Sequence, residues 1–266
     1  MSGAASASEP GALEAHLRAR RAAGRKLLVP YVTGGMAPDW VDVVHALADA
    51  GADAIEIGIP FSDPMIDGPT IQQASVRALA AGTTPRAILG ELARHDVGVP
   101  LAVMTYYNIV FRAGHRRFAR ALADAGVAGA IVPDLPLEES SPWRAEAEDA
   151  GVETVLLVAP STPDDRAAAI CAASRGFVYG VGVMGVTGER AALASSARAV
   201  GARLRTITDK PVCIGIGVSD PGQAAAVCEV SDGVVVGSAL VRRLLDGAGP
   251  AGAAEFVTAL RRGIDG

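Results

Sequence analysis

The sequence has few of the residues on which disulfide-bonded, metal-binding or membrane-spanning proteins depend. Its 266 residues include three cysteines, an odd number spread over Cys171, Cys213 and Cys228. This argues against a disulfide framework or a Cys-x-x-Cys metal site. No apolar run reaches the length of a membrane span, and the opening MSGAASASEPG lacks the apolar stretch of a secretory signal. We therefore expect a soluble protein of the reducing cytoplasm.

Positive charge and histidine are also scarce. The formal net charge is -5 and the pI is about 5.4, so no overall basic field attracts nucleic acid or anionic lipid. None of the four histidines ends a predicted strand, and we expect no metal site. The two lysines, Lys26 and Lys210, each precede a predicted strand. A Schiff-base nucleophile at the carboxyl end of a strand is therefore absent.

Short apolar, β-branched runs alternate with longer alanine-rich patterns of helical period. Eight runs are predicted to be strands: Leu27 to Thr33, Asp53 to Pro60, Pro100 to Tyr107, Gly129 to Asp134, Glu153 to Pro160, Phe177 to Val183, Lys210 to Val218 and Gly233 to Ser238. The predicted helices are Trp40 to Ala50, Thr70 to Ala81, Ala113 to Ala125, Glu138 to Ala150, Pro163 to Ala173, Glu189 to Thr206, Pro221 to Cys228 and one after Pro250.

Eight β-α units over this length predict an α/β fold, a single-domain (β/α)₈ TIM barrel spanning residues 1–266. Residues 1–25 are expected to form an N-terminal extension and a helix, with Leu13 and Leu17 on its apolar face, that closes the bottom of the barrel. Periodicity alone does not distinguish this barrel from an open, doubly wound sheet.

One carboxylate interrupts an apolar strand in AIEIGIPFSDPMIDGPTIQ. Strand alternation places Ile55 and Ile57 on the helix side and Glu56 on the inner side, between the small residues Ala54 and Gly58. A buried carboxylate without a cation is costly, and none of the eight runs contains arginine. Glu56 is therefore a candidate general acid, because burial without a cationic partner raises the pKa of a carboxyl group.

A second carboxylate, Asp67, precedes Gly68 and Pro69 at the start of the next predicted helix. The positive end of the helix dipole favours its ionised form. Glu56 and Asp67 would then differ in pKa, as the two members of an acid and base pair do. From its position alone, helix capping explains Asp67 equally well. Asp63 looks like an ordinary turn residue or a contact at an exposed loop tip.

Glycines follow the last two predicted strands, in CIGIGVSDPG and VVVGSALV. In many barrels the loops at these positions bind phosphate through backbone N–H groups at a helix N-terminus. Gly217, Gly237 and Ser238 fit this role, with tight turns as the plain alternative. The stretch MGVTGE, preceded by a weak G-x-G-x-x-G match, is interpreted as a closing loop in which Gly188 could donate an N–H to the same phosphate.

Tyrosines at strand ends, namely Tyr31, Tyr106, Tyr107 and Tyr179, suggest a flat, apolar part of the substrate, although core packing explains such residues as often. Because no lysine or metal is in place, cleavage of a carbon–carbon bond would need a substrate that supplies its own electron sink.

Several motifs together resemble the tryptophan synthase alpha chain, in the same order and over nearly the whole chain: VPYVTGG, EIGIPFSDPMIDGPTIQ, YYNIVF, PDLPLEES, GVTGE, GIGVSDP and GSALV. The resemblance implies a lyase that converts indole-3-glycerol phosphate to indole and glyceraldehyde 3-phosphate. It implies catalytic roles for Glu56 and Asp67. The implied phosphate-binding residues are Gly188, Gly217, Gly237 and Ser238, and the implied indole-pocket and closing-loop residues are Tyr31, Tyr106, Tyr179 and Thr187.

The same resemblance implies a partner, a beta chain that carries pyridoxal phosphate, in an alpha2beta2 heterotetramer. No cofactor is expected in this chain. The loop bearing Asp63 and Pro64 corresponds to the family's docking region. The sequence departs from the pattern at Gly182 and Val183, where many members carry Ser-Arg, so an arginine that could stiffen the closed loop is missing.

Other functions stay open at this point. One is a stand-alone lyase that releases free indole for a secondary pathway. Another is a non-catalytic allosteric activator of a beta chain, which the unpaired Glu56 argues against. A third is a different barrel lyase or isomerase acting on a phosphosugar.

Overall fold

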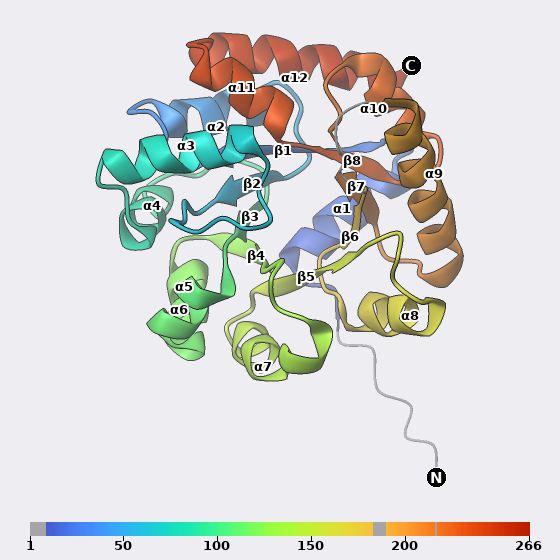
Figure 1. Ribbon diagram of the computed structural model, residues 1–266, viewed down its shortest axis with the longest axis horizontal. Helices are drawn as coiled ribbons and strands as arrows, with labels where there is room; N and C mark the ends of the chain where they lie inside the picture. The colour runs from blue at the N-terminus through green and yellow to red at the C-terminus, as the bar shows by residue number, and fades with distance from the viewer. Residues whose placement is uncertain (1–8, 183–189, 216) are drawn as a thin grey trace.

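Eight parallel strands form a closed barrel in the computed structural model, which describes residues 9–182, 190–215 and 217–266 (Figure 1). The strands run in chain order around the barrel: β1 (Leu27–Thr33), β2 (Ile55–Gly58), β3 (Leu101–Met104), β4 (Val127–Ile131), β5 (Glu153–Val158), β6 (Val178–Val181), β7 (Val212–Gly215) and β8 (Gly233–Val236). Strand β1 pairs with β8, with Leu27 opposite Gly233, and this closure rules out the open, doubly wound sheet.

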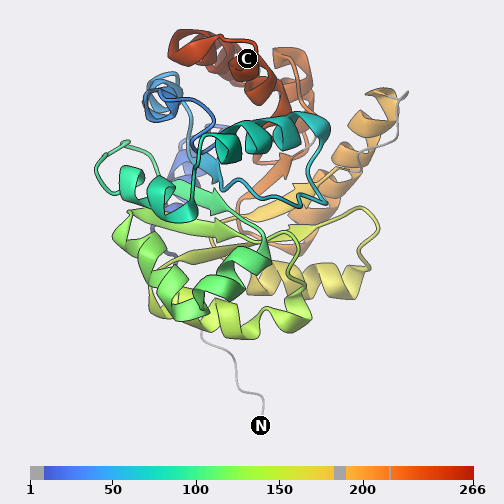
Figure 2. The same cartoon turned by 60° about the vertical axis from the view of Figure 1, so that its left-hand side comes forward.

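Helices surround the barrel, as the side view in Figure 2 also shows. They are α1 (Ala12–Ala22), α2 (Trp40–Asp49), α3 (Pro69–Ala80), α4 (Pro85–Leu92), α5 (Tyr107–Ala113), α6 (His115–Asp124), α7 (Ser141–Asp149), α8 (Asp164–Ala173), α9 (Arg190–Ile207), α10 (Pro221–Cys228), α11 (Ser238–Leu245) and α12 (Gly249–Asp265), with a 3₁₀ turn at Leu137–Glu139. The sequence patterns do not predict α4 and α5. Both are short, and α5 begins within the apolar run that was expected to continue the third strand.

The strands separate two cores. Side chains that point outward, such as Ile55 and Ile57, pack beneath the helices. Side chains that point inward, such as Val29, Ala54 and Phe177, fill the barrel together with residues of α1. The alternation expected for a strand between two layers is therefore observed on β2.

Helix α1 lies within the outline of the barrel, at the end where the strands begin (Figure 1). Its Leu13 and Leu17 are fully buried in the inner core. The Glu153 carboxylate at the start of β5 accepts hydrogen bonds from the backbone N–H groups of Leu13 (2.6 Å) and Glu14 (3.2 Å). This carboxylate satisfies N–H groups that the first turn of a helix leaves unpaired.

Charged side chains gather at the same end of the barrel. The Lys26 ammonium donates to the carbonyl of Ser231, and the Lys210 ammonium donates to three carbonyls at the C-terminus of α8. Both lysines therefore lie opposite the carboxyl ends of the strands, where a barrel carries its active site. This placement agrees with the prediction that neither lysine acts as a nucleophile.

Candidate active site

Glu56 points into the barrel from the middle of β2. It lies opposite Tyr31 of β1 in the parallel register, and only 1% of its surface is exposed. Its Oε2 atom has no hydrogen-bond partner, and no cation pairs with it among the described residues. Burial, and secondly the charge of Asp67, raise the pKa of the Glu56 carboxyl to about 8. At neutral pH this group is a protonated, buried acid.

Asp67 lies in the loop between β2 and α3 and is half-buried. The N-cap of α3 is Gly68, followed by Pro69 in the first turn, and no side chain caps the helix. Helix capping therefore does not explain this carboxylate. The Tyr106 hydroxyl hydrogen-bonds to Asp67 and lowers its pKa, but burial has the larger, opposite effect and the pKa is raised.

The helix dipole was expected to favour the ionised form of Asp67; burial outweighs the hydrogen bond that favours this form, and the pKa is raised. The large change in pKa is nevertheless that of Glu56. Since the negative charge of Asp67 contributes to that shift, Asp67 loses its proton first.

Tyr106 holds the loop that carries Asp67. Its hydroxyl accepts a hydrogen bond from the backbone N–H of Ile66 at 3.1 Å, and its ring stacks on Phe61 with centroids 4.9 Å apart. Phe61 is a candidate site residue that the sequence analysis missed. The signal was present, because Phe61 comes three residues after β2, in the same loop as Asp67.

Two tyrosines cross over glycines of the neighbouring strands. A Cβ atom placed on Gly58 would lie 1.8 Å from the Tyr31 hydroxyl, and one placed on Gly215 would lie 2.4 Å from the Tyr179 hydroxyl. Both distances are shorter than any real contact, so only glycine fits beneath each ring. Glycine inside a strand often marks such a close approach, and this signal could have identified Gly58 and Gly215 from the sequence.

The expected phosphate-binding residues follow the carboxyl ends of β7 and β8. Gly237 is the N-cap of α11, Ser238 is its first residue, and both Gly217 and Ser238 are exposed. The N-terminus of α11 offers unpaired backbone N–H groups and the positive end of a helix dipole. Thr187 and Gly188, the expected closing-loop residues, lie outside the described residues.

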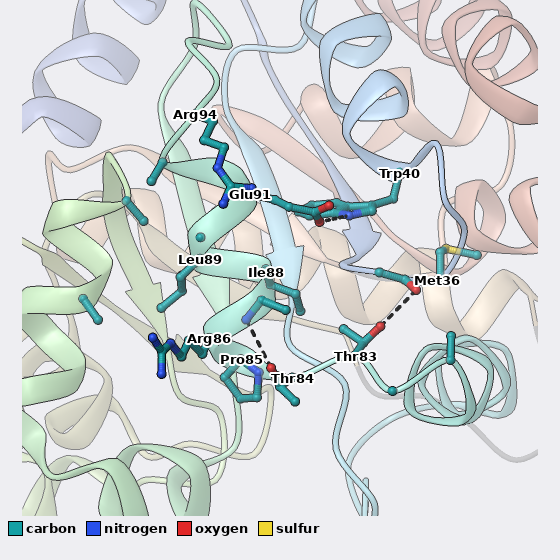
Figure 3. A pocket seen from close by; sticks show the side chains of 18 of the residues that line it. Met36, Trp40, Thr83, Thr84, Pro85, Arg86, Ile88, Leu89, Glu91 and Arg94 are labelled. Atoms are coloured by element: carbon teal, nitrogen blue, oxygen red, sulfur yellow. Dashed lines mark hydrogen bonds between the residues drawn. The ribbon is translucent and has the colours of Figure 1, made fainter.

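A groove of about 1540 Å³ lies on the flank of the barrel, between α2, α4 and α6. Figure 3 shows Trp40 of α2 and Glu91 of α4, which are joined by a hydrogen bond of 2.6 Å. None of the expected site residues lines this groove. Its size alone does not connect it with the chemistry, and the candidate active site is the group of buried side chains around Glu56 on the inner side of the barrel.

Two further observations concern the described part of the chain only. It contains no group of three or more histidine, cysteine or acidic residues that could hold a metal ion. Within the same residues, no helix is both long and apolar enough to span a membrane.

Comparison with known proteins gives one consistent result. The family model "Tryptophan synthase alpha chain" matches residues 17–260. The alpha chain of Streptomyces avermitilis is 45% identical over 98% of this chain and 96% of its own. That of Halorhodospira halophila is 47% identical over 93% of this chain and 94% of its own.

Solved structures agree with these relatives. A structure of Mycobacterium tuberculosis tryptophan synthase contains a chain with 39% identity and a TM-score of 0.89, covering 96% of this chain and 99% of that one. The tryptophan synthase alpha subunit of Legionella pneumophila has 29% identity and a TM-score of 0.88, covering 97% and 99%. The protein therefore belongs to the tryptophan synthase alpha chain family, the lyase subunits that cleave indole-3-glycerol phosphate in tryptophan biosynthesis.

Proposed function

We propose that Glu56 is the general acid of the cleavage reaction. The supporting observation is a fully buried carboxyl group whose Oε2 has no partner and whose pKa, about 8, keeps it protonated at neutral pH. Such an acid can deliver its proton to the ring carbon that bears the glycerol chain. The product of this step is an indolenine tautomer, and its iminium group is the electron sink that the chain itself lacks.

Asp67 acts as the ionised partner. It accepts a hydrogen bond from the indole N–H and stabilises the positive charge that develops on the ring. The hydrogen bond from Tyr106 and the attachment of the loop to Tyr106 support this role, because they fix the position of the carboxylate.

Bond cleavage then returns the electrons to the ring. A carboxylate removes the proton from the hydroxyl next to the ring, that carbon becomes the aldehyde of glyceraldehyde 3-phosphate, and the carbon–carbon bond electrons neutralise the iminium. Indole and the aldehyde leave with the number of protons unchanged. Both Glu56, now ionised, and Asp67 are candidates for the base.

The substrate is held at two places in this proposal. The phosphate binds at the backbone of Gly217, Gly237 and Ser238, at the N-terminus of α11, with Gly188 as a further contact. The indole ring lies among Tyr31, Tyr106 and Tyr179, and Thr187 belongs to the closing loop. The chain works as one domain, and its own residues supply all of this chemistry without a cofactor.

The test is Glu56→Gln, which keeps the shape of the side chain and removes the acid. Purified variant and parent protein are incubated with indole-3-glycerol phosphate while the release of indole is followed. We expect a folded barrel with at least about a hundredfold loss of kcat. Indole release near the parent rate would remove Glu56 as the acid.

We further propose that the chain binds a beta chain in the cytoplasm, as an alpha2beta2 heterotetramer in which only the beta chain carries pyridoxal phosphate. The family name implies this partner. The loop after β2 supports the proposal, since Met65 is 90% exposed and Ile66 53% exposed, and Phe111 of α5 is 64% exposed. Exposed apolar side chains at the loop that the resemblance identifies as the docking region suit a protein interface.

This second proposal is tested by Phe111→Ser, with binding to a purified beta chain measured by calorimetry. Weakened binding with unchanged folding supports it, and unchanged affinity removes Phe111 from the interface. The alternatives, a stand-alone lyase or a non-catalytic activator, are not favoured by family membership.

A further inference from the structure

The side chain of Tyr31 extends from Gly237, at the proposed phosphate site, to the strand that bears Glu56. Its Cβ, Cγ and Cδ1 atoms lie 3.6–3.7 Å from the position of a Cβ on Gly237, the N-cap of α11. Its hydroxyl lies over Gly58, the next inward-facing residue after Glu56 on β2. One ring therefore connects the proposed phosphate site with the proposed acid.

The Tyr31 hydroxyl also has a proton to donate. It accepts a long hydrogen bond of 3.4 Å from the Thr33 hydroxyl, and both residues are buried. Among the described residues this is the only hydrogen bond of the Tyr31 hydroxyl; either hydroxyl of the pair can be the donor, and the length of the bond makes it a weak one. A buried hydroxyl with only a weak partner gains from a better-placed acceptor, so a ligand that supplies one at this place binds more tightly.

The two carboxylates nearby do not provide that acceptor. Neither forms a hydrogen bond with the Tyr31 hydroxyl: Asp67 is bonded by the Tyr106 hydroxyl, and Oε2 of Glu56 has no partner. In indole-3-glycerol phosphate the part between the phosphate and the ring is a three-carbon chain with two hydroxyl groups. This chain has to run along the length that Tyr31 covers, from Gly237 towards β2.

We propose that Tyr31 is a specificity-determining residue, whose hydroxyl donates a hydrogen bond to a hydroxyl oxygen of the substrate's glycerol chain. Its ring borders the cavity, and its O–H distinguishes a glycerol phosphate chain from one without hydroxyl groups. This inference rests on the proposed placement of the phosphate at α11 and of the reacting ring at Glu56.

The test compares two ligands that differ only in those hydroxyls. Indole-3-propanol phosphate keeps the indole ring, the three carbons and the phosphate. Binding of both ligands is measured by calorimetry in a Glu56→Gln parent, where the substrate is not consumed, and again after Tyr31→Phe. We expect Tyr31→Phe to weaken binding of indole-3-glycerol phosphate about fivefold to tenfold, and binding of the propanol compound less than about twofold.

The matched control is Tyr179→Phe, which removes an equally buried hydroxyl that also crosses a glycine, on β7. We expect it to change the affinities of the two ligands by the same factor. The proposal is overturned if Tyr31→Phe weakens both ligands equally, if it weakens neither, or if Tyr179→Phe gives the same loss that is selective for the glycerol compound.

A failure of the Glu56 proposal is detected separately. In that case the Glu56→Gln protein releases indole from the substrate before Tyr31 is changed. In that case the same comparison is made in the unaltered chain, from kcat/KM for indole-3-glycerol phosphate and the inhibition constant of indole-3-propanol phosphate. The Tyr31 proposal is then supported if Tyr31→Phe changes kcat/KM about fivefold more than it changes the inhibition constant, and it is overturned if the two change equally.

Discussion

The fully buried Asp53 carboxylate, at the base of the barrel, lies 3.0 Å from the guanidinium of Arg261 in α12. Arg25 also pairs with it at 2.7 Å, and the backbone N–H of Leu28 donates to it at 2.9 Å. This carboxylate thus connects the segment before β1, the start of β1 and the last helix.

Replacing Asp53 with Asn should leave Arg261 buried without full compensation. We expect the free energy of unfolding to fall by about 3–5 kcal/mol. Urea denaturation measures this change. The control is Asp209→Asn, because Asp209 pairs with Arg18 at 3.2 Å but is 85% exposed. The free energy of unfolding of that variant should fall by less than about 1 kcal/mol. Equal losses for the two variants would contradict the conclusion that the buried ion pair stabilises the fold more than the exposed one.

The pKa of Glu56 predicts how activity depends on pH. If the protonated form is the acid, kcat/KM for indole-3-glycerol phosphate should decrease as the pH rises through about 8, where this carboxyl loses its proton. Steady-state assays from about pH 6 to about pH 9.5 measure this decrease. A rate that stays constant to the upper end would show that the ionised carboxylate is the working form.

Stability should depend on the same group with a definite sign. The folded pKa, about 8, lies above 4.5, the ordinary value of a glutamate carboxyl group. The folded state therefore holds a proton that the unfolded state has lost, and stability falls as the pH rises from about 4.5 to about 8. Glu56→Gln removes this dependence. The urea midpoint of the variant should exceed that of the parent protein at pH 8.5 and approach it at acidic pH. A lower midpoint for the variant at both pH values would contradict the finding that the Glu56 carboxyl is buried without a hydrogen-bond partner.

Gly58→Ala tests the contact between β1 and β2. The added methyl group would lie 1.8 Å from the Tyr31 hydroxyl and 2.4 Å from Cζ, so the ring has to move into the cavity. We expect at least about a tenfold loss of kcat/KM and a lower stability of about 1–3 kcal/mol. A second change, Tyr31→Ala, should restore much of the stability but not the activity. If Gly58→Ala were neutral, the ring would not be fixed where the structure places it.

Lys210 is expected to stabilise the fold at a place remote from Glu56. Its ammonium donates to the carbonyls of Cys171 and Ala172 at 2.9 Å each and of Ser174 at 2.5 Å. Lys210→Met should lower the free energy of unfolding by about 2 kcal/mol, because the helix end loses its cation. Lys26 donates to one carbonyl only, so Lys26→Met should cost about half as much by the same measurement.

Local sequence patterns were sufficient to predict the barrel architecture and the inward orientation of Glu56. The alternation of Ile55, Glu56 and Ile57 specifies which side chain faces inward, whatever the neighbouring strands are. The ends of the strands were less accessible: β2 was expected from Asp53 to Pro60 and spans Ile55–Gly58, because pairing with β1 and β3 decides where a strand stops.

The environment of Asp67 could not be predicted from local sequence patterns. Its pKa depends on burial and on the hydroxyl of Tyr106, which belongs to the end of another strand. The approach of Tyr31 to Gly58 likewise depends on how far a side chain reaches between strands. These are distances between distant parts of the chain, and a sequence pattern does not contain them.

The helix that precedes the first strand has a consequence for the acid chemistry. Leu13 and Leu17 of α1 are buried in the inner core at the lower end of the barrel, so α1 adds to the burial that raises the pKa of Glu56. A truncation that removed α1 would open this core from below and shift the pKa of Glu56 towards that of an ordinary carboxyl group. The proton needed for turnover is thus retained by a segment that never meets the substrate.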